Sequence, residues 1–235
     1  MRIQNKMRLS FILSFSFILL VACNSDDSAK DSLEKEGETT QVEDNEVNKE
    51  PENKPVELDD EGNQNALATL KPTENIIKTF NQNDEYTLTE SIVDMNDTYI
   101  QRVFEIGDMV TLQVLKWNED IIQVVYEESD PESPRESILH DFTSNKEMHP
   151  IVDITHKGTG DSPIWEIVSE DETIEVPYQK FQGVYKVKST VSAGSGQAVN
   201  TIYFAPGIGM IKEVFEETGE DGYIIESVLE EVESL

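Results

Sequence analysis

The chain has 235 residues, of which 48 are acidic and 18 are basic, so its formal net charge at pH 7 is −30. A polyanion of this kind repels the phosphates of DNA and RNA, which excludes nucleic acid as an expected partner. The single cysteine excludes an intramolecular disulfide and a zinc site built on several thiolates. We interpret the charge mainly as a source of solubility, although it would also attract cations or basic partners.

The first 22 residues have the layout of a signal peptide. Arg2, Lys6 and Arg8 form a basic n-region, and the run from Leu9 to Ala22 is apolar apart from serines. This run is shorter than the ~17–25 residues that a membrane-spanning helix needs. Residues 1–22 are therefore expected to direct export and to be removed.

Cys23 closes the tetrapeptide Leu-Val-Ala-Cys directly after this run. That order resembles the lipobox of bacterial lipoproteins. The resemblance implies cleavage before Cys23, lipidation of its sulfur and anchoring at the extracytoplasmic face of the cell membrane. Two acyl chains would make the anchoring stable, where one chain alone is marginal. The alternatives are an ordinary secretory signal with an incidental cysteine, or a short N-terminal membrane helix.

Residues 23–71 form a segment of different composition. It contains no aromatic residue and is dominated by Glu, Asp, Asn, Lys, Ser and Thr. Such a segment buries too little apolar surface to offset the entropy of ordering it, so we expect a disordered acidic linker. As a random coil it would span about 40 Å on average. We interpret it as a spacer, with a partner-binding tail as the alternative.

The remaining residues, 72–235, are enough for one domain with a proper core. Lys71-Pro72 favours a short helix that runs to Thr79. The segment 138–142 is ambiguous between a strand and a helical turn. Alternating and β-rich runs separated by turn residues predict strands at 99–106, 109–117, 121–127, 164–168, 172–176, 184–191, 198–205, 211–216 and 223–232. The expected fold class is mainly β, with α+β possible, and its closely spaced strands suggest an antiparallel meander.

The stretch 203–212 reads YFAPGIGMIK and is the most specific pattern of the domain. It lacks the third glycine, the Gly-Lys-Ser/Thr and the following helix of a phosphate loop. We therefore expect a bend between strands, where glycine permits positive φ and proline lies outside the ladder.

Together with the stretch 174–187, this pattern resembles the C-terminal domain of exported lipoproteins of low-GC Gram-positive bacteria. The resemblance covers residues 164–232. Gln179-Lys180 departs from the usual Gly-Thr or Gly-Lys before Phe181, which puts the local turn in doubt. The resemblance implies one curved antiparallel sheet or half-barrel with one or two short helices, as in lipoprotein-carrier-like domains. It transfers no catalytic residue.

The sequence indicates no catalytic, cofactor or metal site. His140, His149 and His156 lie close together, but their spacing matches neither a helix face nor a zinc finger. The stretch 94–97 lacks the twelve-residue ligand pattern of a calcium loop. No serine lies in Gly-x-Ser-x-Gly or Ser-x-x-Lys.

These observations predict a lipid-anchored, non-enzymatic binding module outside the cytoplasmic membrane. Its expected partners are the membrane, through lipid on Cys23, and an apolar ligand or peptide held on the concave face of the sheet. Tyr185, Val187 or Tyr203 are candidate lining residues, although alternation alone does not tell which face is concave. A structural or protein-interaction component of the cell envelope without a small ligand is the alternative, and a hydrolase is the third hypothesis.

Overall fold

The computed structural model describes residues 67–144, 148–156, 162–193, 196–219 and 222–235. The signal segment 1–22, Cys23 and the linker as far as residue 66 lie outside the described residues. Within the described ranges, no helix is long and apolar enough to cross a membrane.

The described residues form strands and two short 3₁₀ helices. The helices are η1 (Ala68–Leu70) and η2 (Leu139–Asp141). The strands are β1 (Ile76–Gln82), β2 (Tyr86–Met95), β3 (Tyr99–Ile106), β4 (Met109–Trp117), β5 (Ile121–Ser129), β6 (Pro150–Asp153), β7 (Ile164–Glu175), β8 (Lys180–Ala193), β9 (Gly196–Ala205), β10 (Gly209–Glu217) and β11 (Tyr223–Ser234).

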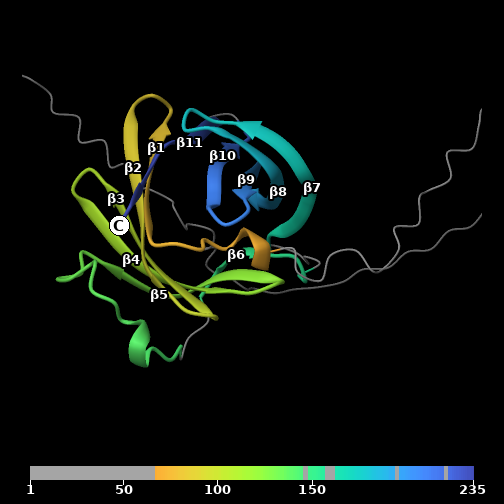
Figure 1. Cartoon of the computed structure of the whole chain (residues 1–235). Coiled ribbons are helices and arrows are strands. Elements are labelled where there is room, and N and C mark those ends of the chain that lie inside the picture. The colour runs from red at the N-terminus through yellow and green to blue at the C-terminus, as the bar shows by residue number, and fades with distance from the viewer. Residues whose placement is uncertain (1–66, 145–147, 157–161, 194–195, 220–221) are drawn as a thin grey trace, which may run out of the picture. The chain divides into compact units, whose positions relative to one another are not determined.

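All strands belong to one 11-stranded antiparallel sheet in the order β6-β5-β4-β3-β2-β1-β11-β10-β9-β8-β7. Two meanders, β1 to β6 and β7 to β11, are joined where β1 pairs with β11, from Ile76 opposite Ser234 to Gln82 opposite Ser227. The sheet curves strongly, and the part from β7 to β10 bends round into a partly closed barrel (Figure 1). The expected mainly β fold of one curved antiparallel sheet is confirmed.

Contacts between strands that are not neighbours show that the sheet curls over one of its faces. The ring of Trp117 on β4 meets the ring of Phe204 on β9 edge-on, with their centroids 6.0 Å apart. Phe80 on β1 and Leu229 on β11 lie opposite each other on the same face and are fully buried. We call this enclosed side the inner face of the sheet.

The outer face of β3 to β5 is covered by the segment that follows β5. Leu139 of η2 packs against Val114 and Val125, with Phe142 beside them. The side-chain amide of Gln101 holds this segment, since it donates to the Glu136 carbonyl at 2.7 Å and accepts from the Ile138 amide at 2.8 Å. The ambiguous segment 138–142 thus contains a 3₁₀ turn, and it packs against the outer face of the sheet.

The packed chain begins ahead of the expected domain start at residue 72. Leu67 and Leu70 are fully buried, and the Leu67 carbonyl accepts a hydrogen bond from the Trp117 indole at 2.8 Å. These leucines supply the apolar area that the rest of the linker lacks. The helix expected from residue 71 is wrong, because Ile76–Gln82 is a strand that alternates between buried and half-buried side chains.

The β9–β10 turn confirms the expected bend at Pro206–Gly209. Gly207 and Gly209 have φ values of 73° and 80°. The turn is tied to the N-terminal residues, since the Thr73 amide donates to the Gly207 carbonyl at 3.0 Å and the Gly207 amide donates to the Thr69 carbonyl at 3.1 Å. Residues 67–73, which we call the N-terminal seal, therefore join the end of β4 to the β9–β10 turn.

Candidate binding site on the inner face

Charged and amide side chains cross the inner face from β1 to β5. Lys78 lies opposite Glu90 in the β1–β2 pair, with Nζ 2.6 Å from Oε2. Arg102 on β3 bonds Glu90 at 3.0 Å and donates twice to Gln113 Oε1 on β4, at 2.7 and 3.0 Å. The Gln113 amide donates to Glu127 Oε2 on β5 at 2.6 Å. We call these five residues the charged ladder.

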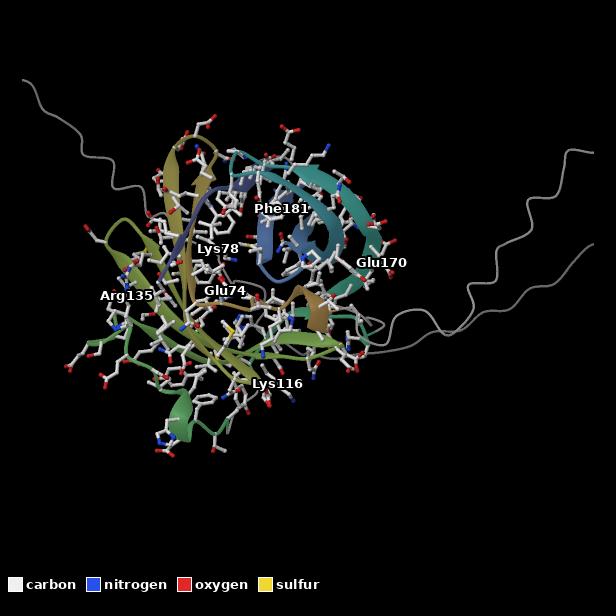
Figure 2. The ribbon with its side chains drawn as sticks, in the orientation of Figure 1. Glu74, Lys78, Lys116, Arg135, Glu170 and Phe181 are labelled. Atoms are coloured by element: carbon white, nitrogen blue, oxygen red, sulfur yellow. The ribbon has the colours of Figure 1, made fainter. Side chains whose placement is uncertain are left out.

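The polar groups of the charged ladder bond mainly to one another. The fully buried Lys78 ammonium also donates to the carbonyls of Ile208 and Met210, at 3.3 and 3.1 Å. Figure 2 shows this side chain reaching from β1 toward β10, while Arg135 lies outside the sheet. Burial lowers the pKa of Lys78, against the pull of Glu90.

The pKa of Glu90 is lowered as well. Burial by itself would raise it, but the adjacent charges of Lys78 and Arg102 outweigh that effect. Paired charges of this kind are held in place by one another and fix which strand positions face each other. We therefore assign the charged ladder a structural role.

The three histidines do not form a site. The His140 side chain is almost fully exposed beside Asp141 on η2, and His156 is exposed after β6. His149 is half-buried, and burial lowers the pKa of its imidazole, which favours the neutral form. Among the described residues, no group of three or more His, Cys, Asp or Glu side chains is arranged to hold a metal ion.

A second row of polar side chains crosses the inner face from β8 to β1. Asn200 lies opposite Ser189, Glu213 lies opposite Ser227, and Ser227 lies opposite Gln82. The Gln82 amide donates to Ser227 Oγ at 3.1 Å, and the Asn200 amide donates to Glu213 Oε1 at 2.8 Å. We call Ser189, Asn200, Glu213, Ser227 and Gln82 the polar belt.

The polar belt separates two apolar regions of the inner face. Toward the β9–β10 turn the side chains are buried core, namely Val187, Ile202, Phe204 and Ile211. The apolar side chains at the belt and toward the β8–β9 hairpin keep contact with solvent; Tyr223, for example, is 42% exposed. We call this second set the inner rim: Trp165, Val191, Ala198, Phe215, Tyr223 and Ile225.

The inner rim is an aromatic and aliphatic surface with a polar base. The rings of Phe215 and Tyr223 lie with centroids 5.8 Å apart. Burial, with the nearby Glu217, raises the pKa of Tyr223. Burial also raises the pKa of Glu213, against the hydrogen bond from Asn200 and the charge of Arg102. A half-buried apolar surface beside a carboxyl and an amide suits a ligand that is mostly apolar and has one polar end.

The candidate lining residues divide between the two faces. Tyr185 and Val187 lie on the inner face, opposite Phe204 and Ile202. Tyr203 lies on the outer face, where the Nζ atoms of Lys186 and Lys212 are 5.4 and 5.8 Å from its ring centroid.

Sequence reasoning did not single out Asn200, Glu213 or the charged ladder. The available signal was a polar residue at alternate positions of an apolar run, as in Ile76-x-Lys78-x-Phe80. That signal does not tell whether the polar residue faces inward.

No family model matches the sequence, and no curated protein matches it at a significant level. Two solved structures are similar to the chain. One is a provisionally assigned lipoprotein from Parabacteroides distasonis, with 11% identity, a TM-score of 0.35, and coverage of 70% of this chain and 98% of its own. The other is a provisionally assigned exported protein with a YmcC-like fold from Bacteroides fragilis, with 12% identity, a TM-score of 0.34 and the same coverage. Likeness at this level establishes neither a common fold nor a common function.

Proposed function

We propose that this chain is a lipid-anchored protein of the extracytoplasmic face that binds an apolar ligand or peptide without catalysing a reaction. The observation that carries the proposal is the inner rim. Its side chains point to the enclosed side of the sheet, yet they are only half-buried and Tyr223 is exposed, while the apolar side chains beyond the polar belt are buried.

The physical reason is the area that the inner rim leaves in contact with water. Removing apolar surface from water stabilises a complex by roughly 25 cal/mol per Å². The six apolar residues of the inner rim, which keep contact with solvent among the described residues, therefore offer a ligand apolar surface to cover. Phe215, Tyr223 and Trp165 add flat aromatic surface, which is typical of ligand sites.

The charges of the ladder support a role without catalysis. The carboxylate of Glu90 and the cations of Lys78 and Arg102 are engaged with one another and with backbone or amide groups. A general acid or base has to reach a substrate atom, and groups locked in this way cannot. The membrane anchor in the proposal rests on the Leu-Val-Ala-Cys order that ends at Cys23.

A matched pair of variants on β11 tests the proposal. Ile225 belongs to the inner rim, whereas its neighbour Ile224 is 58% exposed on the opposite face. The full chain is purified from membranes in a mild detergent, and its intact mass is measured under native conditions. We expect a bound amphiphile on the wild type and on Ile224→Ser, and its loss from Ile225→Ser. A bare wild-type mass, together with no uptake of added alkyl probes, would exclude the binding function.

An envelope-interaction protein without a small ligand is the second candidate. The specific observation in its favour is the edge strand β7, where Ile164 and Val168 are 54% and 44% exposed. The exposed side chains of β7 could contact a partner. Pairing of the β7 backbone with another strand is opposed by its repeated register shifts and by the carboxylates of Glu166 and Glu172. Under this alternative, Val168→Lys would abolish capture of an envelope partner, and Ile225→Ser would have no effect.

A further inference from the structure

Glu213 lies at the base of the inner rim and forms no ion pair among the described residues, although the charge of Arg102 acts on it. It projects from β10 on the same face as Phe215 and is half-buried. Its described partner is the neutral amide of Asn200. The ion pairs found among the described residues involve Glu90, Glu105, Asp141 and Glu226, and none involves Glu213.

Asn200 brings a second acceptor to the same place. Its amide nitrogen donates to Glu213, which leaves Oδ1 as the acceptor end of the side chain. That oxygen is buried and finds no hydrogen-bond donor among the described residues. A buried acceptor without a partner costs about 1–3 kcal/mol, so a donor supplied by a ligand would remove a cost that the protein carries alone.

The cations of the inner face are already engaged. Lys78 is held by Glu90 and two backbone carbonyls, and Arg102 is held by Glu90 and Gln113. A carboxylate or phosphate at the rim would therefore meet the carboxyl of Glu213, while Arg102, whose charge acts on Glu213, is already bonded to Glu90 and Gln113. The net charge of −30 acts in the same direction.

We propose that the ligand of the inner rim is an amphiphile with a protonated amine, which Glu213 and Asn200 bind. The ammonium donates to the Glu213 carboxylate and to Asn200 Oδ1, while the apolar chain lies along Trp165, Phe215 and Ile225. Hydrogen bonds to an ionised group are about twice as strong as neutral ones, so the head group sets the selectivity. This inference rests on the proposed binding function and names the chemical class of its ligand.

The test compares three probes with the same chain and different heads: dodecylamine, dodecanol and dodecanoate, each below its micelle concentration. Binding to the full-length protein is followed through the emission of Trp165, since Trp117, the other tryptophan, is buried in the core. We expect the amine to bind at least about tenfold more tightly than the alcohol, and the carboxylate to bind most weakly.

Two variants on β10 separate the head group from the chain. Glu213→Gln keeps the shape and the acceptor oxygen for Asn200, and it should reduce the affinity for dodecylamine to that for dodecanol. Glu216→Gln changes an exposed carboxylate on the outer face of the same strand and should leave all three affinities unchanged.

The outcomes distinguish this inference from the proposed function. If the three probes bind with equal affinity and Ile225→Ser weakens all of them, the rim is a binding site and the amine selectivity is wrong. The amine selectivity is also wrong if dodecanoate binds most tightly of the three probes, or if Glu213→Gln binds dodecylamine with the affinity of the wild type. If no probe binds, the proposed function itself fails.

Discussion

Removing the negative charge of Glu90 should destabilise the protein more than any other single charge change in the described residues. Each oxygen of this carboxylate meets a cation, with Lys78 Nζ at 2.6 Å and Arg102 Nη1 at 3.0 Å. The substitution Glu90→Gln keeps the side-chain shape but leaves two buried cations with one carboxylate fewer. It also places an amide NH₂ against groups that are donors themselves.

The loss of stability in Glu90→Gln depends on which hydrogen bonds Lys78 and Arg102 keep. Breaking a buried ion pair by removing one partner costs roughly 3–5 kcal/mol. The carbonyls of Ile208 and Met210 still accept from Lys78, and Gln113 still accepts from Arg102. We therefore expect about 3 kcal/mol at neutral pH, near the lower end of that range. For a domain of this size, such a loss lowers Tm by about 6–12 °C.

The pH dependence gives the prediction a sign. The pKa of Glu90 in the fold lies below the ordinary value of 4.5, because Lys78 and Arg102 outweigh the opposing effect of burial. A carboxyl with a lowered pKa stabilises the fold above its unfolded pKa, and this contribution is lost as the pH falls through the folded pKa. The stability difference between wild type and Glu90→Gln should therefore be full at neutral pH and shrink below about pH 4.5.

Urea unfolding followed by tryptophan fluorescence, at neutral pH and at about pH 4, measures both effects. Glu105→Gln serves as the control, because Glu105 pairs with Arg135 at the surface, where a salt bridge contributes at most about 1 kcal/mol. A loss of less than about 1 kcal/mol for Glu90→Gln, or a stability difference that does not change with pH, would refute the account of the charged ladder.

Three further predictions concern the seal, the turn and the anchor. Leu70→Ala opens a cavity at a fully buried site and should cost about 2–5 kcal/mol in the same urea experiment; an unchanged midpoint would show that the seal does not stabilise the fold. Gly209→Ala should lower Tm more than Gly107→Ala, because both have positive φ but only at 209 would a Cβ approach Pro72, at 3.2 Å. Equal losses would contradict the close packing of the turn. Cys23→Ala should move the protein from the membrane fraction to the medium, and an unacylated protein that stays in the membrane would contradict the anchor.

The strands that sequence reasoning predicted are those with a clear alternation or a dense run of β-branched residues. The segments 99–106 and 109–117 appear as β3 and β4 with the expected turn between them. The sequence predicts a helix as far as Thr79, over the first half of β1, because Lys71-Pro72 is a typical helix start and Lys78 lies at an inward position. A lysine on the buried face interrupts the alternation of apolar and polar residues that indicates a strand. Its burial can be explained only when its partner Glu90 on the next strand is known.

The candidate site was harder to predict for a related reason. On β10, Glu213 and Phe215 face inward while Lys212 and Val214 face outward, so each face carries one charged and one apolar residue. Alternation then fixes which residues share a face but not which face the sheet encloses. Only the curl of the sheet, seen in the contact between Trp117 and Phe204, decides that question.

Short-range quenching of tryptophan tests the central claim, that the inner rim receives an apolar chain, most directly. A brominated alkyl chain quenches a tryptophan only when the two are nearly in contact, and Trp165 and Trp117 report from the rim and from the core. We predict saturable quenching of Trp165 that disappears in Trp165→Phe and in Ile225→Ser. Quenching that does not saturate, or that persists unchanged in Trp165→Phe, would contradict the account.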